Sequence, residues 1–427
     1  MRSWSAVRIA REAGAELRGE AAPMEPSAAP ARGPDRVVID SRDVGPGDLF
    51  VGLVGEHVDG GVYAAAALEA GAWGVLVAPE HAVAGGVVLV SPAPLASLQA
   101  LARAWRRTLP AQVIAITGSV GKTSTKDLVR ALIAPHRRVH ASRANFNTEI
   151  GLPLELLAAP ADSEVLVLEM GMRGAGQIAE LAAIAEPGVG LITAIGAVHL
   201  ELLGSIEAIA RTKAELLQNV RVAIVPDDES RLDPYLPAGV AVVRFGADDG
   251  SLDALELPFT SAHMRRNALA AVAAARAVGV EPAGRIALEL SAMRGQVLAL
   301  GDGVTVVEDC YNANPLSMRA ALDDLAQQSP AGRRIAVLGD MLELGPTEVA
   351  EHEAIGAHAA ASGVDVLVTV GPLAAAMAGA FGGEAHVEVD APAAASLVRE
   401  LVAPGDRVLV KASRGVRLEA VTEALAA

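Results

Sequence analysis

The sequence is poor in cysteine, in aromatic residues and in uninterrupted apolar runs. Cys310 is the only cysteine among 427 residues, which excludes an internal disulfide and favours a reducing compartment such as the cytoplasm. Phe, Trp and Tyr together make up 3% of the chain, so its cores must be built from Ala, Val, Leu and Ile. The longest apolar stretch, residues 187–203, contains His199 and Glu201 among glycines and a proline. Such a stretch is too interrupted to span a membrane.

The chain also lacks an excess of positive charge. Its net charge is −16, which argues against a general nucleic-acid surface or an anionic-membrane surface. An anionic substrate stays possible, because a phosphate site needs only local donors. Arg2, Arg8 and Arg11 interrupt the N-terminus before a signal-type apolar core can form. We therefore expect a cytoplasmic protein without membrane insertion, and a monomer.

The length and pattern of the chain predict an α/β protein with three domains. A small N-terminal α/β domain is expected at 1–110, with a helix at 4–19. A central domain with a parallel sheet is expected at 111–295, and a C-terminal Rossmann-like domain at 296–427. The strands expected in the last two domains are 113–117, 165–170, 190–195, 222–225, 304–308, 335–339, 366–370 and 408–411.

Residues 113–125, Val-Ile-Ala-Ile-Thr-Gly-Ser-Val-Gly-Lys-Thr-Ser-Thr, predict a phosphate-binding loop. A buried strand leads into a turn with Gly118 and Gly121, and a helix follows at once. Backbone N–H groups converge on a phosphate in such a turn, and glycines let the backbone approach it. Lys122 would reach the outer phosphates, and the Thr123 hydroxyl would bind Mg²⁺.

The loop departs from the general G-x-x-x-x-G-K-[ST] pattern, because Ile116 stands at the first glycine position. A glycine turn with a chance Gly-Lys-Thr is the alternative interpretation. The strand before the loop and the helix after it favour the phosphate site.

Two polar residues follow other strands of the same predicted sheet. Glu169 ends one strand, and His199 follows the next. Ligands of parallel sheets lie at the carboxyl ends of the strands, so both side chains could join Thr123 in binding two Mg²⁺ ions. A surface carboxylate and a structural histidine are the alternatives. Lys213 lies in a helix with an apolar face, and its pattern alone predicts a solvated lysine.

Three further polar loops are candidates for binding. Residues 145–153 form a polar loop before a helix. Residues 309–315, Asp-Cys-Tyr-Asn-Ala-Asn-Pro, and 339–345, Gly-Asp-Met-Leu-Glu-Leu-Gly, each follow a strand of the C-terminal domain. Plain turns are the alternative, but two such loops at one sheet edge indicate a binding face for a polar ligand.

With these motifs the chain resembles the Mur ligases, whose short nucleotide loop lacks the extra leading glycine. The loops at 145–153, 309–315 and 339–345 are similar to those of the members that add D-alanyl-D-alanine to a UDP-N-acetylmuramoyl-tripeptide. Residues 40–60 are similar to the UDP-substrate domain of those enzymes. The resemblance covers nearly the whole chain.

The resemblance implies an ATP-dependent ligase of peptidoglycan synthesis that uses Mg²⁺. ATP would phosphorylate the terminal carboxylate of the tripeptide, and the amine of D-alanyl-D-alanine would displace the phosphate. The N-terminal domain would bind the UDP substrate, the central domain ATP, and the C-terminal domain the dipeptide. A sister ligase with another amino-acid acceptor, or a folylpolyglutamate-like ligase, is the alternative.

The resemblance also assigns residues. Lys122, His199 and Lys213 would be catalytic, with Lys213 carbamylated and binding metal together with Thr123, Glu169 and His199. ATP would contact Gly118, Ser119, Val120, Gly121, Lys122, Thr123, Ser124, Asn267, Arg294 and Asp309. Ser41 and Arg42 would contact the UDP end, and Asn145, Asn147, Tyr311, Asn312 and Asn314 the acceptor.

The chain departs from the family pattern in three places. Ser261 and Met264 replace a Gly and an Asn before Asn267, and the segment between Gly246 and His263 is shorter than usual. Ala412 stands where glycine is usual. These differences bear on the adenine side of the site rather than on the type of reaction.

Overall fold

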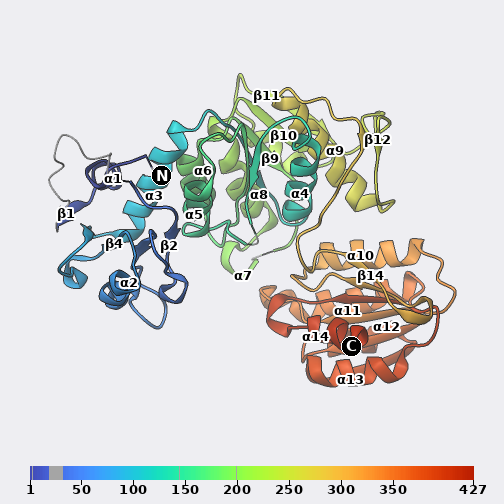
Figure 1. The fold of residues 1–427 in the computed structure, drawn as a ribbon. Coiled ribbons are helices and arrows are strands. Elements are labelled where there is room, and N and C mark those ends of the chain that lie inside the picture. The colour runs from blue at the N-terminus through green and yellow to red at the C-terminus, as the bar shows by residue number, and fades with distance from the viewer. Residues whose placement is uncertain (2, 19–31, 144, 199) are drawn as a thin grey trace. The chain divides into compact units, whose positions relative to one another are not determined.

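The computed structural model describes the whole chain apart from residues 2, 19–31, 144 and 199. The described residues separate into two compact units. The first unit comprises Met1–Ala115, His136–Met172 and Gly176–Val189, and the second comprises Ile116–Pro135, Arg173–Ala175 and Gly190–Ala427. Figure 1 shows the helices and strands of both.

The N-terminal part has a five-stranded sheet in the order β1-β5-β4-β3-β2. Its strands are β1 (Glu16–Arg18), β2 (Val37–Val38), β3 (Leu49–Val51), β4 (Gly74–Val77) and β5 (Val87–Val90), and its helices are α1 (Ala6–Ala13), α2 (Ala64–Glu69) and α3 (Pro94–Thr108). Among the strands described in this sheet, β1 and β5 pair antiparallel and the other pairings are parallel. The core of this sheet is formed by side chains from β3, β4, β5 and α2: Phe50, Val75, Val77, Val88, Val90, Ala64 and Ala67.

The central part contains a six-stranded sheet in the order β11-β10-β9-β6-β8-β7 and a small β12–β13 pair. The strands are β6 (Gln112–Thr117), β7 (Val139–Ala141), β8 (Val165–Glu169), β9 (Val189–Ile192), β10 (Val222–Pro226), β11 (Ala241–Phe245), β12 (Leu255–Glu256) and β13 (Gly284–Arg285). The helices are α4 (Lys122–Ile133), α5 (Gly151–Ala158), α6 (Gln177–Ala185), α7 (Leu200–Leu203), α8 (Ile206–Ala214) and α9 (Ala262–Ala277). β6 and β8 are buried along nearly their whole length, as expected for strands covered on both faces.

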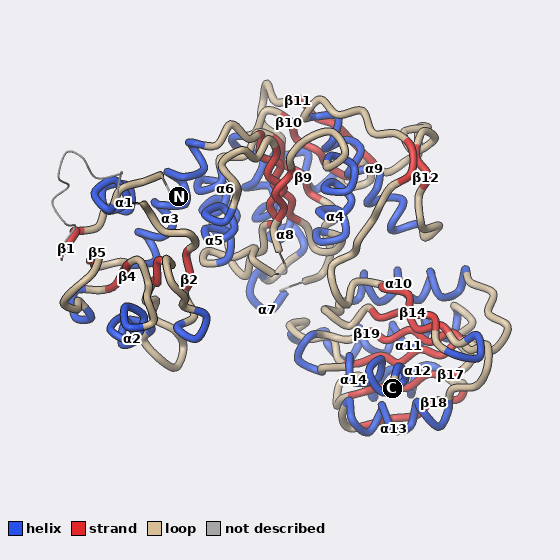
Figure 2. Tube along the Cα trace, in the orientation of Figure 1, coloured by secondary structure: helices blue, strands red, loops and turns tan. Residues whose placement is uncertain are grey.

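The C-terminal part is doubly wound, with the sheet order β14-β15-β19-β16-β17-β18. Its strands are β14 (Gln296–Ala299), β15 (Thr305–Glu308), β16 (Arg334–Gly339), β17 (Val366–Val370), β18 (Glu384–Glu388) and β19 (Arg407–Lys411). Its helices are α10 (Pro315–Gln327), α11 (Glu348–Ala361), α12 (Ala375–Phe381), α13 (Ala391–Leu401) and α14 (Glu419–Ala426). Apart from β14–β15, the pairings are parallel. The tube in Figure 2 shows these strands in red between blue helices.

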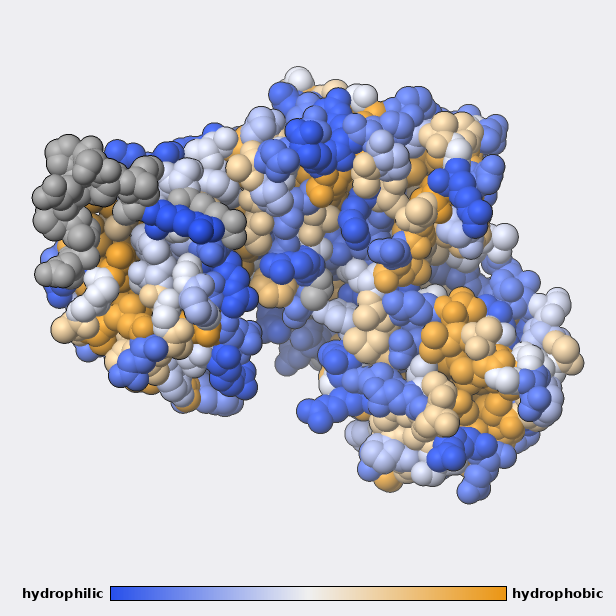
Figure 3. Space-filling model, viewed as in Figure 1, coloured by the Kyte–Doolittle hydropathy of each residue, from blue (hydrophilic) through white to orange (hydrophobic). Residues whose placement is uncertain are grey.

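Alternate residues of the C-terminal strands enter two different cores. On β16, Ala336 and Leu338 pack with α10, α11 and α12, whereas Ile335 and Val337 pack with α13 and α14. This follows from the two-residue period of a strand, which places neighbours on opposite faces. On the surface, polar side chains cover most of the face seen in Figure 3, and apolar side chains gather over the C-terminal part.

The α/β class predicted from the sequence is confirmed, with corrections to single elements. The helix expected at 4–19 is wrong beyond α1, because Gly14 adopts a left-handed conformation and ends the helix, and β1 follows. The strand expected at 190–195 ends at Ile192. The antiparallel strand β14 was not predicted. No helix among the described residues is both long and apolar enough to cross a membrane.

Candidate active site

The loop between β6 and α4 has the predicted strand, glycine turn and helix. Gly118 and Gly121 have φ angles of +152° and +82°. A Cβ on Gly118 would lie 1.9 Å from Thr193 Oγ1, and one on Gly121 would lie 2.7 Å from Asn267 Oδ1. Neither position has room for a side chain, so both glycines are required by the close packing of the loop.

Hydrogen bonds from residues that follow β9, and from the loop's own lysine, hold the loop in place. Thr193 Oγ1 donates to the Val120 carbonyl at 2.5 Å, and the Gly196 N–H donates to Ser119 Oγ at 2.9 Å. Lys122 Nζ donates to the Gly118 carbonyl at 2.9 Å. The lysine therefore folds back over the turn, which is the placement that a phosphate-contacting cation requires.

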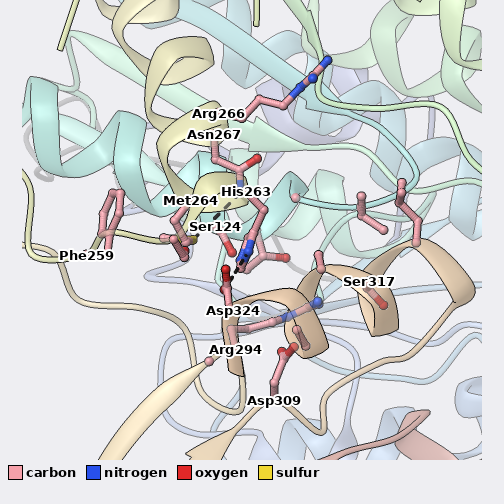
Figure 4. Close-up of a pocket in the computed structure, with 18 of the residues that line it drawn as sticks. Ser124, Phe259, His263, Met264, Arg266, Asn267, Arg294, Asp309, Ser317 and Asp324 are labelled. Atoms are coloured by element: carbon pink, nitrogen blue, oxygen red, sulfur yellow. Dashed lines mark hydrogen bonds and ion pairs between the residues drawn. The ribbon is translucent and has the colours of Figure 1, made fainter. Parts of the chain in front are cut away.

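The loop opens on a cavity of about 1110 Å³ within the second unit. Figure 4 shows side chains that enter it. Its wall includes the loop residues 119–124, apolar side chains such as Phe259 and Leu290, and polar groups from α9 and the C-terminal sheet. An apolar cleft with a few polar groups beside an anion loop suits a nucleotide.

Helix α9 contributes His263, Met264 and Asn267 to this cavity. The Asn267 side chain abuts Gly121 and also lies near Met264 Sδ. His263 Nδ1 lies 2.9 Å from Asp324 Oδ2 of α10, as the dashed line in Figure 4 shows. The replacement of the family's asparagine by Met264 therefore puts an apolar, 7% exposed side chain in the cavity wall.

Arg294 and Asp309 line the same cavity. The Arg294 guanidinium lies 4.0 Å from the centre of the Tyr311 ring, a cation–π contact. Asp309 Oδ2 accepts from Lys411 Nζ at 2.5 Å, and Lys411 also donates to the Asn312 carbonyl at 3.2 Å. The buried Lys411, which the sequence did not single out as functional, thus holds the 309–312 turn.

The loops at 309–315 and 339–345 lie at one edge of the C-terminal sheet, as predicted, since β15, β19 and β16 are parallel neighbours. Ser413 Oγ joins them, because it accepts from the Leu342 N–H at 3.1 Å and donates to the Ala313 carbonyl at 3.4 Å. The Asn314 side chain accepts from the Ser317 N–H and caps α10. The structure therefore gives Asn314 a structural role, and its contact with an acceptor stays a prediction.

The expectation of a solvated Lys213, based on pattern alone, is wrong. Lys213 is 2% exposed on α8. Burial lowers its pKa well below the usual value, and the charge of Lys122 lowers it further. The protonated form of this amine is therefore less favoured than that of a solvated lysine.

Glu169 belongs to the first unit, where it is 2% exposed at the end of β8. Asn147 Nδ2 donates to Glu169 Oε1 at 2.9 Å, and the Asn147 carbonyl accepts from the Gly171 N–H at 2.8 Å. Asn147 was predicted to contact the acceptor, yet its side chain orients the predicted metal ligand. Second-layer contacts of this kind fix a ligating carboxylate. The other loop asparagine, Asn145, is exposed.

The first unit also contains a buried ion-pair cluster that sequence reasoning missed. Glu155 of α5 is fully buried and accepts from Arg143 Nε at 2.7 Å, with His140 Nε2 3.4 Å away. Burial by itself raises the pKa of the Glu155 carboxyl, but hydrogen bonds from His140 and Arg143 outweigh it and hold that pKa below its usual value. The cluster fastens the segment that leads to Asn147. A glutamate on an otherwise apolar helix was its only signal.

Ser41 and Arg42 lie in a short 3₁₀ turn, Ser41–Asp43. The Arg42 side chain is 86% exposed and pairs with Asp40. Hydrogen bonds from Arg42 lower the pKa of the Asp40 carboxyl to about 2. The described residues contain no group of three or more His, Cys, Asp and Glu side chains that could hold a metal. His199 lies outside the described residues.

Three family models match the chain in succession. The model of the Mur ligase family catalytic domain matches residues 35–112, the Mur ligase middle domain matches 116–264, and the Mur ligase glutamate ligase domain matches 293–414. Together they account for most of the sequence. The chain belongs to the Mur ligase family.

Curated Mur ligases are similar to it over nearly their full length. The UDP-N-acetylmuramoyl-tripeptide–D-alanyl-D-alanine ligases of Mycobacterium tuberculosis (strain H37Rv) and Bacillus subtilis (strain 168) are 40% and 34% identical to it. The alignments cover 92% and 91% of this chain and 92% of each relative.

Solved Mur ligase structures have the same fold. MurF from Acinetobacter baumannii superposes with a TM-score of 0.85 at 26% identity, covering 99% of this chain and 98% of that one. MurF from Thermotoga maritima in complex with ADP gives a TM-score of 0.80 at 28% identity, covering 91% and 96%. The likeness extends over all three predicted domains.

Within the Mur ligase frame, the cavity brings together most of the residues predicted for ATP. All of them except Gly118 line it: Ser119, Val120, Gly121, Lys122, Thr123, Ser124, Asn267, Arg294 and Asp309. Of the residues predicted for the acceptor, Asn312 and Asn314 also line it and Tyr311 does not, and neither does the predicted catalytic Lys213. Asn145, Asn147, Glu169, Ser41 and Arg42 lie in the first unit. The ligand-binding and catalytic roles assigned to the residues of both groups stay predictions.

Proposed function

We propose that this Mur ligase joins D-alanyl-D-alanine to UDP-N-acetylmuramoyl-tripeptide, at the expense of ATP, to give the UDP-linked pentapeptide of peptidoglycan synthesis. The observation that carries the proposal is the nucleotide loop, whose Lys122 faces a cavity shared with Asn267, Arg294 and Asp309. Similarity to D-alanyl-D-alanine ligases over nine-tenths of the chain supports the choice of substrates.

The reaction requires two anions to meet. The tripeptide carboxylate attacks the γ-phosphorus of ATP, its oxygen forms a bond to phosphorus, and ADP leaves. The D-alanyl-D-alanine amine then attacks the acyl carbon, loses a proton, and phosphate leaves with the carboxylate oxygen. Lys122 lowers the repulsion between carboxylate and γ-phosphate, because it holds a positive charge at the turn of the loop.

The ATP base and ribose would occupy the cavity beyond the loop. Phe259, Met264 and Leu290 give this part an apolar surface, and Asn267 lies at its junction with the phosphate loop. Asp309 is held by Lys411 with its carboxylate toward the cavity, so it can accept from ribose hydroxyls. Arg294 would add a cation to the wall of the same cavity.

Mg²⁺ would be held by Thr123, Glu169, His199 and a carbamylated Lys213. The residues that the structure describes fit this role: Glu169 is a buried carboxylate oriented by Asn147, and Lys213 is a buried amine with a lowered pKa. Carbamylation needs the neutral amine: its nitrogen would form a bond to the carbon of CO₂ and lose a proton to solvent, which leaves an anionic carbamate with oxygen donors. The bound ions would neutralise phosphate charge.

The three domains would divide the work. Residues 1–110 would bind the UDP end through Ser41 and Arg42, and 111–295 would bind ATP. Residues 296–427 would bind the dipeptide through the loops at 309–315 and 339–345, which Ser413 joins into one face. A nucleotide-linked substrate and a single cysteine favour the cytoplasm as the place of action.

Phosphate release from ATP tests the proposed reaction. We expect release only when UDP-N-acetylmuramoyl-tripeptide and D-alanyl-D-alanine are both present with Mg²⁺, with one phosphate formed for each pentapeptide detected by mass spectrometry. Omission of either substrate should reduce release by at least 100-fold, roughly the loss expected when a reacting group is absent.

The matched alternatives are single amino acids, such as D-glutamate, D-alanine or L-lysine, in place of the dipeptide, and a folate in place of the muramoyl substrate. Turnover with one of these and none with D-alanyl-D-alanine would contradict the proposal and identify a sister ligase instead.

A further inference from the structure

The helix that follows the phosphate loop contains a buried ion pair whose two residues do not line the cavity. Lys126 and Asp127 of α4 are 3% and 6% exposed. Lys126 Nζ lies 3.0 Å from Asp127 Oδ1. A buried pair of charges is costly unless further hydrogen bonds satisfy it, so its other contacts are informative.

Those contacts lead to one residue, 164 positions further along the chain. The Ser291 N–H donates to Asp127 Oδ2 at 2.8 Å, and Ser291 Oγ donates to Asp127 Oδ1 at 3.2 Å. Lys126 Nζ donates to Ser291 Oγ at 3.3 Å. Ser291 lies in residues 286–295, a stretch without helix or strand that joins β13 to β14. The first turns of the phosphate-loop helix therefore hold this connection.

Two residues later the same connection is fixed to the C-terminal sheet instead. The Met293 carbonyl accepts from the Tyr311 N–H at 3.2 Å, and the Gly295 N–H donates to the Glu308 carbonyl at 2.8 Å. The Met293 side chain packs against the core formed by β15 to β19 with α13 and α14. The attachment thus changes from α4 to the C-terminal sheet between Ser291 and Met293.

The backbone at this step is strained. Met293 has a φ of +58°, a left-handed conformation that is uncommon for a residue with a side chain. Such conformations persist where contacts on both sides enforce them, and they gather at hinges and switches. Here Ser291, held by Asp127, and Gly295, held by Glu308, constrain the backbone on either side of Met293.

We propose that Asp127 is a positioning residue for catalysis: it fixes one side of a pivot at residues 291–293 about which the C-terminal sheet turns toward the phosphate loop. The inference rests on the ATP site proposed above. Arg294 follows the pivot directly, lies over the Tyr311 ring and lines the same cavity as Asp309. Because the pivot is attached to α4, Arg294 and Asp309 would move toward ATP about a point that is fixed relative to the phosphate loop.

Substitution of a residue that contacts the nucleotide would change both nucleotide affinity and turnover, whereas loss of this anchor should change turnover alone. Lys126 and Asp127 do not line the cavity. Loss of the anchor should therefore leave nucleotide affinity nearly intact while slowing turnover, because hinge residues act on the closing step and not on the chemical groups.

Asp127→Ala tests this prediction, with Ser291→Ala and the double variant alongside. We expect kcat for Asp127→Ala to fall at least ten-fold, while the dissociation constant of Mg·ADP, measured by calorimetry, changes less than three-fold. Ser291→Ala removes the Oγ contact with Asp127, which Asp127→Ala removes together with the contact to the Ser291 N–H. The double variant should therefore be no slower than Asp127→Ala. Limited proteolysis, which is independent of turnover, should show faster cleavage within 286–295.

Asp406→Ala is the matched control. Asp406 is also a buried carboxylate that accepts from backbone N–H groups and pairs with Arg333. The Asp406→Ala substitution should lower the melting temperature of the chain, but it should not speed cleavage within 286–295 or selectively lower kcat. Unchanged kcat in Asp127→Ala, weakened ADP binding of similar size to the kcat loss, or multiplicative losses in the double variant would overturn the proposal. Absence of turnover in the wild-type chain would instead contradict the proposed function, and proteolysis would still test the anchor.

Discussion

Lys122→Met is expected to lower kcat by about 10³-fold, the loss typical of removing a cation that stabilises a transferring phosphoryl group. Lys122 is the first residue of α4, and its amine lies over the turn that would hold the outer phosphates. Without its charge, the tripeptide carboxylate and the γ-phosphate repel each other as they meet. Steady-state phosphate release with both substrates saturating measures the change.

The shape of Lys122 matters as well as its charge. Lys122→Arg keeps the cation but replaces a compact ammonium with a planar fork, so we expect it to recover only part of the activity. Lys122→Met should not unfold the chain, because it removes a charge that disfavours protonation of the buried Lys213 amine. A Lys122→Met enzyme with more than a tenth of wild-type kcat would contradict the assigned role.

Lys213→Met is expected to remove activity and to stabilise the fold at neutral pH. Burial and the charge of Lys122 lower the pKa of the Lys213 amine well below 10.5. The unfolded chain therefore binds this proton more tightly than the folded chain does, and folding is penalised at every pH below the unfolded pKa. The penalty shrinks as pH rises from the folded pKa toward 10.5 and vanishes above it.

The melting temperature of Lys213→Met should accordingly exceed that of the wild type at pH 7 and converge with it above pH 11. Each kcal/mol regained corresponds to roughly 2–4 °C for a domain of this size. Scanning calorimetry in buffers free of CO₂, which keep the amine unmodified, measures the difference. A lower melting temperature at pH 7 would show that the buried amine stabilises the fold.

The same residue allows a chemical test of carbamylation. Lys213→Ala leaves a space where a carboxylate from solution could stand in for the carbamate oxygens. We expect acetate or propionate to restore part of the activity of Lys213→Ala, and to leave Lys122→Met inactive. Equal responses of the two variants would argue against a metal-binding carbamate at position 213.

The parts of the molecule that were predicted correctly depend on local pattern. Buried strands such as 113–117 and 366–370 are short runs rich in apolar and β-branched residues, as is typical of sheets covered on both faces. The phosphate loop was predictable because Gly118, Gly121 and Lys122 act within five residues. Polar residues after parallel strands share one edge, and this placed the 309–315 and 339–345 loops together.

The features that were missed depend on contacts between distant segments. Lys213 looks solvated along its own helix, and only the packing around α8 buries it. Asp127 and Ser291 are 164 residues apart, and nothing in either segment points to the other. Asn147 was assigned by motif to the acceptor, whereas its side chain contacts Glu169 through the fold of its own loop. The sequence pattern of a helix or strand shows its hydrophobic periodicity, but it does not show which distant segments the element contacts.

Transfer of ¹⁸O from the substrate to phosphate tests the acyl-phosphate reaction most directly. UDP-N-acetylmuramoyl-tripeptide labelled with ¹⁸O in its terminal carboxylate would be incubated with ATP, Mg²⁺ and D-alanyl-D-alanine, and the released phosphate analysed by mass spectrometry. If the carboxylate attacks the γ-phosphorus held at Lys122, each phosphate leaves with one labelled oxygen. Pentapeptide formed with unlabelled phosphate would contradict the acyl-phosphate route.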